Sequence, residues 1–409
     1  MWKIAFSKPL LLQSRGYEAT IRADREPQVT ADSVFLLTRP IMNFASDNTT
    51  GASDVILRAV MAANEGEAPA YGKDPLGAKA AQLLCQTFGC DCGCFLVNTG
   101  TAANALALAA ISPPFGAIFC HSESHIMADE CGAPEMFTGG AKLIGIPGRA
   151  GKIALPELKA ALSQYPRGVE KQVQPAVLSL TQLTESGTIY TCEELASLSA
   201  LAHDAGLMVH MDGARFANAL VALRCTPAEM SWKAGIDVLS FGATKNGALG
   251  CEAVIFFDPE KAANMPYLRK RGGHTLSKGR FLGAQMIAYL ENGHWLDLAK
   301  AANAQAQKLA QGLATIPGVR LPWPCEGNEI FAILPHALDE ALRAKGALYY
   351  PWNFRDFAVG CAPPEQDEVF VRLVTSFATR SLDVERFLNV AATAGFRTTS
   401  DSKIISTGP

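Results

Sequence analysis

One lysine of this chain stands in an unusually apolar setting. Lys245 lies in the stretch 238–257, which reads VLSFGATKNGALGCEAVIFF. The apolar runs at its two ends predict short strands, and the glycine-containing segment 242–250 predicts a tight loop between them. Apolar surroundings disfavour the ammonium form of a lysine, so its amine becomes available to form a Schiff base with a carbonyl compound. The alternative is a loop lysine whose head group extends into water.

Two charged residues follow another predicted strand. Asp212 and Arg215 lie in the string HMDGAR, directly after the strand expected at 208–211. The aspartate could keep the ring nitrogen of a cofactor protonated, or it could cap the next helix. The arginine could bind a substrate carboxylate through two parallel hydrogen bonds, or it could pair with the aspartate. The position at a strand end favours a site over an isolated ion pair.

A third pattern resembles an anion site. The strand expected at 93–97 passes through Asn98-Thr99-Gly100-Thr101 into a helix at 102–110. Free backbone N–H groups and the helix dipole meet at such a turn, so Gly100 and Thr101 are candidates for holding a phosphate. The string is neither a P-loop nor G-x-G-x-x-G, so a bare nucleotide or a dinucleotide is not favoured.

The elements that must position these groups alternate along the chain. Expected strands at 93–97, 117–120, 142–146, 176–180, 208–211, 238–241 and 253–257 are separated by expected helices. This order predicts an α/β fold with a mostly parallel, doubly wound sheet. Ligands of such sheets bind at the carboxyl ends of the strands. The candidates that would meet there are His121, His125, Gln182, Asp212 and Lys245.

At 409 residues the chain is long enough for more than one domain. We expect an N-terminal extension at 1–40, a large cofactor-binding domain at 41–295, a small C-terminal α+β domain at 296–398 and a loose tail at 399–409. The Ala-rich pattern at 281–313 predicts one long helix that carries the chain into the second domain.

Composition excludes several classes of partner. The net charge of -3 leaves no basic footprint for nucleic acid or an acidic membrane surface, and no apolar run is long enough to span a bilayer. Eleven cysteines without a secretory signal predict a reduced, cytoplasmic setting. Cys85, Cys90, Cys92 and Cys94 could chelate a soft metal, but no second Cys or His pair lies at zinc-site spacing. We therefore expect packing residues and no metal site.

Several strings, taken together and in order, resemble the L-threonine aldolase family. They are SDNTT at 46–50, AYGKDP at 70–75, NTGTAAN at 98–104, HMDGAR at 210–215 and SFGATKNGALG at 240–250. That family belongs to the pyridoxal-phosphate-dependent enzymes of fold type I, the aspartate-aminotransferase-like fold. The strings TQLTESGT at 181–188 and LSKGRF at 276–281 are similar to its low-specificity and phenylserine aldolase branch.

The resemblance implies a role for each candidate. Lys245 would attach pyridoxal 5'-phosphate, Asp212 would pair with the ring nitrogen and His125 would stack on the ring. The other cofactor contacts would come from Gly100, Thr101, Gln182 and Arg215, with Lys270 and Lys278 reaching in from a neighbouring subunit. The substrate would be bound by Ser46, Tyr71, Arg215 and Arg372. A homo-oligomer, dimer or tetramer, with shared active sites is implied.

The implied reaction is the reversible cleavage of an L-3-hydroxy-2-amino acid into glycine and an aldehyde. Some family members carry a histidine in the loop after the strand at 176–180, where this chain has Thr184-Glu185. The base is therefore assigned to His125 or to an ordered water. The same cofactor also supports β-elimination, racemisation and transamination. The sequence leaves open a noncatalytic binding protein on the same fold and a nicotinamide oxidoreductase, although the glycine fingerprint of the latter is missing.

Overall fold

The computed structural model describes residues 42–353 and 362–404. The extension expected at 1–40 lies outside the described residues. Helix α13 (Ser381–Ile404) continues into the tail that we expected to be loose from 399. No proline or glycine interrupts the sequence between 396 and 404, so nothing local ends the helix earlier.

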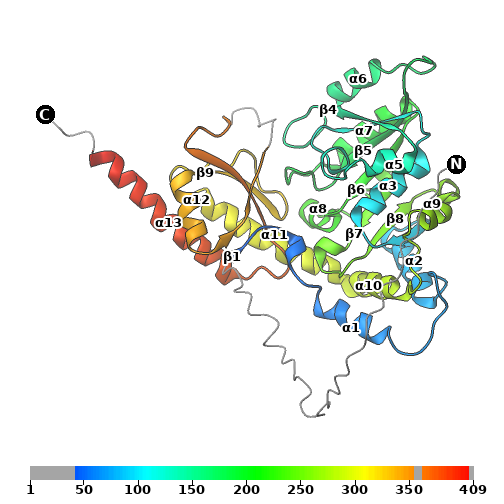
Figure 1. The fold of residues 1–409 in the computed structure, drawn as a ribbon, viewed down its shortest axis with the longest axis horizontal. Coiled ribbons are helices and arrows are strands. Elements are labelled where there is room, and N and C mark those ends of the chain that lie inside the picture. The colour runs from blue at the N-terminus through cyan, green and yellow to red at the C-terminus, as the bar shows by residue number, and fades with distance from the viewer. Residues whose placement is uncertain (1–41, 354–361, 405–409) are drawn as a thin grey trace, which may run out of the picture. The chain divides into compact units, whose positions relative to one another are not determined.

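The main sheet has seven strands in the order β2-β8-β7-β6-β5-β3-β4 (Figure 1). Their bounds are β2 (Gly93–Val97), β3 (Gly116–His121), β4 (Lys142–Ile146), β5 (Gln174–Thr181), β6 (Met208–Gly213), β7 (Val238–Gly242) and β8 (Glu252–Phe256). Strand β8 runs antiparallel to both of its neighbours, and the other pairs are parallel. The expected mostly parallel sheet is confirmed, and β2, β3, β5, β6 and β7 end at one edge.

Helices cover both faces of this sheet. Apolar side chains of α1 (Asp54–Ala62), α2 (Pro75–Phe88), α7 (Cys192–Asp204), α8 (Phe216–Leu223) and α10 (Arg280–Leu290) share one core with the strands. Side chains of α3 (Gly100–Ile111), α4 (His125–Ala128) and α9 (Met265–Arg271) enter smaller clusters with Val97, Val238 and Val254 or with the β3 side chains. Two further helices belong to this region, α5 (Ala133–Thr138) and α6 (Leu155–Ser163).

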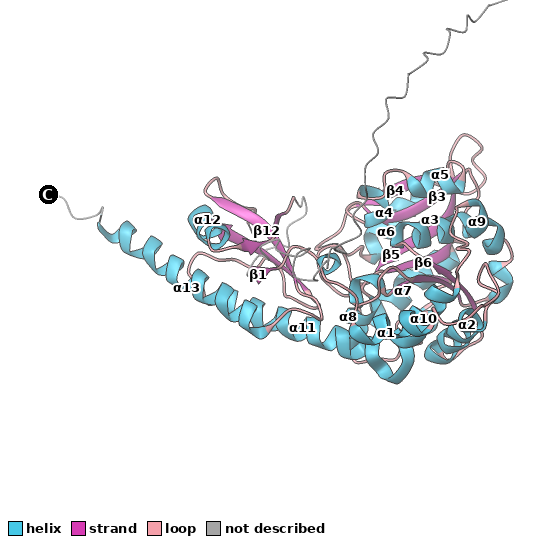
Figure 2. Cartoon of the chain, turned by 60° about the horizontal axis from the view of Figure 1, so that its bottom comes forward, coloured by secondary structure: helices cyan, strands magenta, loops and turns pink. Residues whose placement is uncertain are grey.

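A second hydrophobic core lies in the C-terminal part. Its three-stranded antiparallel sheet has the order β11-β12-β9, from β9 (Glu329–Pro335), β11 (Tyr350–Pro351) and β12 (Glu368–Val374). Helices α12 (His336–Ala344) and α13 pack together beside it (Figure 2). Strand β1 (Met42–Asn43) pairs with β10 (Ala347–Leu348), so the first described strand joins this core although it stands before the large sheet in the sequence.

The single helix expected at 281–313 is two helices. A short turn separates α10 from α11 (His294–Leu313), because Asn292 and Gly293 both have positive φ, at 57° and 70°. Both residue types tolerate that conformation. The first part of α11 packs on the main core through Trp295 and Ala299, and its later turns pack on the second core. Helix α11 therefore belongs to both cores.

No helix in the described part of the chain is long and apolar enough to cross a membrane.

Candidate active site

Two adjoining cavities lie at the edge where the parallel strands end. The inner cavity, with a volume of about 270 Å³, is lined by residues at the ends of β2, β5, β6 and β7 and at the start of α3. The outer cavity, of about 520 Å³, includes Ser46, Trp352 and Arg372 in its lining. The residues that line both cavities are Asn48, His125, Glu185, Arg215 and Lys245.

Lys245 lies in the short 3₁₀ turn η4 (Thr244–Asn246) between β7 and β8. The turn is anchored on both sides. The Glu252 carboxylate of β8 accepts the backbone N–H of Ala243 at 2.7 Å, and the Asn246 amide donates hydrogen bonds to α10 and to the first turn of α11. Lys245 is half-buried, and it contributes to the walls of both cavities.

Asp212 is buried at the end of β6 and is held from two sides. Its Oδ1 accepts the backbone N–H of Ala214 at 3.0 Å, and its Oδ2 accepts the Asn104 amide at 2.8 Å. Arg215 occupies the N-cap position of α8, and its ion-pair partners are Asp47 and Glu329, not Asp212. Asp212 therefore neither caps α8 nor pairs with Arg215, and it lines the inner cavity.

His125 belongs to the same hydrogen-bond network. Its Nδ1 lies 2.8 Å from Oε1 of Glu130, and the Asn104 amide donates to that same oxygen at 2.8 Å. Asn104 therefore links His125, through Glu130, to Asp212. The hydrogen bond with Glu130 raises the pKa of His125 against the opposing effect of burial. The imidazole is held in one orientation at the border of the two cavities.

The start of α3 is arranged to bind an anion. Thr99 is the N-cap, and its hydroxyl accepts the backbone N–H of Ala102 at 3.1 Å. The first N–H groups of a helix have no partner inside the helix, which leaves those of Gly100 and Thr101 for a ligand. A Cβ built on Gly100 would meet nothing within 4 Å, so the turn borders open space. Both residues line the inner cavity.

Arg215 is already engaged within the protein. Its Nε and NH2 donate to the two oxygens of Asp47 at 2.8 and 3.1 Å, and NH2 lies 3.3 Å from Oε1 of Glu329. Burial works against the charge, but the two carboxylates raise the pKa of Arg215 well above its usual range. The bidentate face that we expected to hold a substrate carboxylate is therefore occupied by Asp47.

Arg372 on β12 is better placed for a substrate anion. Its guanidinium lies 4.0 Å above the ring of Trp352, and its NH1 is 3.6 Å from Oε1 of Glu329. The side chain is 17% exposed and lines the outer cavity. Ser46, which lines the same cavity, caps η2 (Asp47–Thr49) through its hydroxyl.

Gln182 does not join the site. It is fully buried, its amide nitrogen donates to the Tyr190 carbonyl at 2.8 Å and its amide oxygen accepts the Tyr190 N–H at 3.0 Å. Its neighbours Thr181 and Leu183 line the inner cavity instead. Because these two hydrogen bonds direct the Gln182 side chain to Tyr190, the expected cofactor contact of Gln182 does not fit this geometry.

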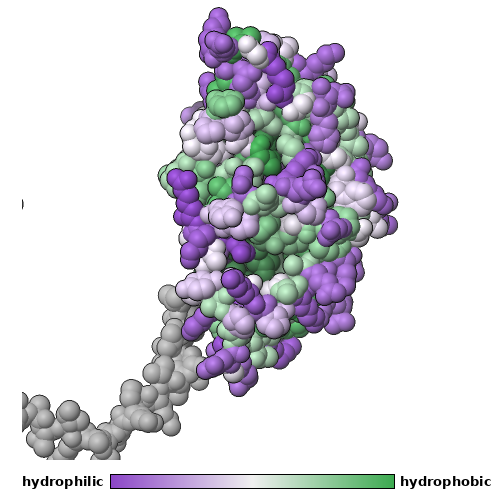
Figure 3. All heavy atoms as spheres, turned by 90° about the vertical axis from the view of Figure 1, so that its right-hand side faces the viewer, coloured by the Kyte–Doolittle hydropathy of each residue, from purple (hydrophilic) through white to green (hydrophobic). Residues whose placement is uncertain are grey.

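The residues expected to serve a neighbouring subunit lie outside both cavities of their own chain. Lys270 is exposed, with its ammonium 4.9 Å from the ring centroid of Tyr71, and the Tyr71 N–H donates to Ser277, next to the exposed Lys278. The face that includes α9 and α2 carries apolar patches between polar side chains (Figure 3). Tyr71 and Tyr267 are 52% and 76% exposed.

Sequence reasoning missed the residues that connect the predicted ones. Asn104 had a signal, because it is a polar side chain in the first turns of a helix of Gly, Ala, Leu and Ile apart from Thr101. Asp47 and Glu185 stand inside strings noted for their resemblance, yet their partners are distant in sequence. The complete set of missed residues is Asp47, Asn104, Glu130, Glu185, Glu252 and Glu329.

These groups fit pyridoxal phosphate. The amine of Lys245 suits the aldehyde of this cofactor, and the buried carboxylate of Asp212 suits its ring nitrogen. The flat ring of His125 suits the face of the cofactor ring, and the open N–H groups at the start of α3 suit its phosphate. All of them line the inner cavity. The fold and the site together define a pyridoxal-phosphate-dependent enzyme of fold type I.

Comparisons with known proteins agree. A family model described as beta-eliminating lyase matches residues 43–334. A low specificity L-threonine aldolase of Pseudomonas aeruginosa is 42% identical over 319 residues, which cover 77% of this chain and 90% of the relative. The solved structure of the Leishmania major threonine aldolase has a TM-score of 0.80 at 29% identity, covering 87% of this chain and 99% of that one.

A serine palmitoyltransferase of Sphingomonas wittichii shares the fold, with a TM-score of 0.65 at 15% identity over 88% of each chain. The chain belongs to the beta-eliminating lyase family and, within it, to the L-threonine aldolases.

Proposed function

We propose that this protein is a pyridoxal-phosphate-dependent aldolase that reversibly cleaves L-3-hydroxy-2-amino acids, of the threonine, allo-threonine or phenylserine type, to glycine and an aldehyde. The observation that carries this proposal is the convergence of Lys245, Asp212 and His125 on one cavity that adjoins a second, arginine-lined cavity. The aldolase relative at 42% identity supports the same activity.

When bound, the cofactor supplies an aldehyde for covalent attachment and a protonated ring that withdraws electrons from the substrate's α-carbon. Lys245 would hold the cofactor through its aldehyde. Asp212, fixed by Asn104 and Ala214, would keep the ring nitrogen protonated. His125 would lie against the ring, and the N–H groups of Gly100 and Thr101 would hold the phosphate.

The outer cavity accommodates the amino acid. Arg372 binds the substrate carboxylate, with Ser46 as a further donor, while Arg215 positions this side of the site through Asp47 and Glu329. This division revises the expectation that Arg215 itself forms the fork, because Asp47 already occupies its bidentate face. His125, which the sequence also made a candidate base, has one ring nitrogen engaged by Glu130.

We also propose a homo-oligomer in a reduced cytoplasm. Lys270, Lys278 and Tyr71 form an exposed group that would reach the phosphate and the pocket of a neighbouring subunit. All ten cysteines in the described residues are free thiols, which is the form expected in a reducing compartment.

The test compares products from wild type and Lys245→Ala. Wild type with pyridoxal phosphate should convert L-threonine or L-phenylserine to equal amounts of glycine and aldehyde. Lys245→Ala should lose the visible absorbance of the attached cofactor and fall in kcat on the order of 10⁴-fold or more. Lys300→Ala, at an exposed position, is the control. Ammonia or an α-keto acid in place of glycine would contradict the aldolase and favour elimination or transamination.

A further inference from the structure

One carboxylate lies where the two cavities meet. Among the described residues, Asp212 and Glu252 line only the inner cavity, and Glu123 and Asp129 line only the outer one. Glu185 lines both. A substrate whose amine replaces Lys245 and whose carboxylate binds Arg372 must cross this border, so its reacting bonds lie near Glu185.

The loop that carries Glu185 is well anchored. The Glu185 Oε1 accepts the backbone N–H of His125 at 2.8 Å, which attaches it to the first turn of α4. On either side of it, Thr184 and Thr188 bond through their backbones at 2.9 Å and through their hydroxyls at 2.8 Å. The carboxylate is therefore held in position before any substrate arrives.

The charge environment suits proton transfer near neutral pH. Burial, and next the charge of Asp212, raise the pKa of Glu185 to about 7, although His125 and Lys245 act in the opposite direction. The Arg215 guanidinium is a further cation facing it. By contrast, the hydrogen bond to Glu130 stabilises the charged form of His125 and raises its pKa, so less of that imidazole is in the neutral form that can accept a proton.

Resting on the proposed function, we propose that Glu185 is the general base that accepts the proton of the substrate's β-hydroxyl group. As the proton moves to Glu185, the C–O bond of the β-carbon becomes the aldehyde carbonyl and the Cα–Cβ bond breaks. The electron pair of that bond stays with the α-carbon, which takes a proton from water, and Glu185 releases its proton to solvent. In the synthetic direction Glu185 donates to the aldehyde oxygen.

The matched variant is Glu185→Gln, because its amide oxygen can still accept the His125 N–H. We expect an unchanged cofactor absorbance, a loss of kcat for cleavage on the order of 100-fold or more, and loss of the acidic limb near pH 7 in kcat/KM. Exchange of the glycine α-proton in heavy water should persist, since it involves no β-hydroxyl group. Glu340→Gln, at an exposed position of α12 that lines neither cavity, is the control.

Several outcomes would overturn this role. Cleavage by Glu185→Gln within about threefold of wild type, with the acidic limb retained, would assign the proton to another group. If Glu185→Gln lost both cleavage and the exchange of the glycine α-proton, the substitution would have damaged the whole site and the specific role of Glu185 would be wrong. A wild type that forms no glycine from any 3-hydroxy amino acid would overturn the proposed function as well.

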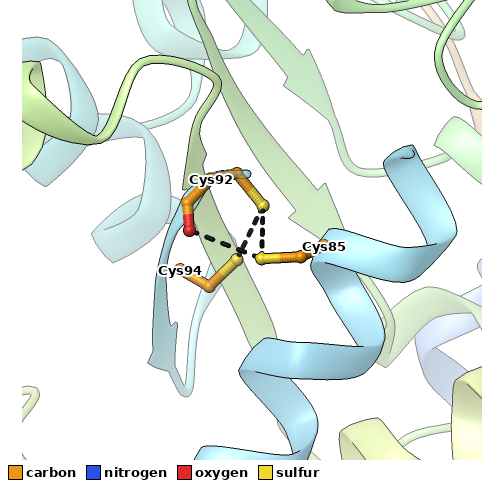
Figure 4. A group of neighbouring side chains, drawn as sticks. All are labelled: Cys85, Cys92 and Cys94. Atoms are coloured by element: carbon orange, nitrogen blue, oxygen red, sulfur yellow. Dashed lines mark hydrogen bonds between the residues drawn. The ribbon is translucent and has the colours of Figure 1, made fainter. Parts of the chain in front are cut away.

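A separate group of three thiols lies away from both cavities. Cys85 in the last turns of α2, Cys92 in the following loop and Cys94 on β2 point toward one another (Figure 4). The Cys92 sulfur is 3.1 Å from that of Cys85 and 3.4 Å from that of Cys94, and all three lie within 4.8 Å of one another. The spacing in sequence favoured packing roles, but the fold brings the three sulfurs to one point.

We propose that these three cysteines form a binding site for a thiophilic metal ion such as Zn²⁺ or Cd²⁺. Metal–thiolate bonds of about 2.3 Å place sulfur ligands roughly 3.8 Å apart, so small side-chain movements would complete the site. Burial raises the pKa of the Cys85 thiol, so binding would release protons. Because β2 leads directly to Gly100 and Thr101, the ion would stabilise the connection before the phosphate turn.

The test titrates reduced, chelator-treated protein with Cd²⁺ and follows the thiolate-to-metal absorbance in competition with a chromophoric chelator. Wild type should bind one equivalent, and Cys85→Ser/Cys94→Ser should lose affinity by roughly 100-fold. Cys192→Ser/Cys225→Ser, which removes another pair of neighbouring thiols, should keep it. If wild type and the Cys85/Cys94 variant bound Cd²⁺ with equal affinity, or if both double variants lost the same affinity, the binding would be adventitious and the proposed site would be wrong.

Discussion

The inner and outer cavities are built in different ways. In the inner cavity, Asp212 and Lys245 lie at the ends of two neighbouring strands of one sheet; Asn104 holds Asp212 through a hydrogen bond, and Glu252 holds the turn that carries Lys245. The outer cavity combines a loop near the first described strand with β12 of the second core. The residues proposed to hold the cofactor thus lie on one sheet, whereas those proposed to bind the substrate draw on both cores.

Asn104→Ala should have the largest effect of the three changes that separate the cavities. The Asn104 amide donates one hydrogen bond to Glu130 and one to Asp212, so the substitution leaves both buried carboxylates without this donor. The free energy of unfolding should fall by about 1–3 kcal/mol. The free energy of binding of pyridoxal phosphate should weaken by a similar amount. Urea denaturation and a titration with pyridoxal phosphate measure both. An effect on KM for the amino acid alone would contradict the inner-cavity role.

Arg372→Lys should act on the outer cavity alone. Lysine keeps the charge but loses the planar fork and its contact with Trp352, so KM for L-threonine should rise roughly tenfold. Cofactor affinity should not change. Steady-state kinetics measure KM, and the absorbance spectrum reports cofactor binding. Weaker cofactor binding with a normal KM would instead assign Arg372 to the cofactor.

Glu252→Gln should have the smallest effect and tests the support of the lysine turn. Burial raises the pKa of Glu252 to about 7, so its contribution to stability is complete below the ordinary glutamate pKa and is lost as the pH rises through 7. At pH 8 and without cofactor, the free energy of unfolding of the variant should exceed that of wild type by about 1 kcal/mol. At pH 4.5 the two values should be equal. Denaturation at the two pH values checks this, and the Ala243 N–H retains an acceptor in the variant.

The sequence predicted the elements of the main sheet well, because each strand and helix leaves a local apolar pattern. The position of Lys245 and Asp212 at strand ends followed from the same pattern, since parallel strands end at one edge. The Asn292-Gly293 break between α10 and α11 also had a local signal, although the Ala-rich pattern around it predicted a continuous helix.

What the sequence by itself determined was therefore the sheet, the edge where its parallel strands end, and the residues that resemble the aldolase motifs. Only the tertiary structure decided that Asp47 forms an ion pair with Arg215, although 168 positions separate them. The same holds for the pairing of β1 with β10 and for the position of Glu185 at the border of both cavities. These are contacts between segments distant in the chain. Periodicity reports which face of an element is buried, but it does not report which partner the fold brings against that face.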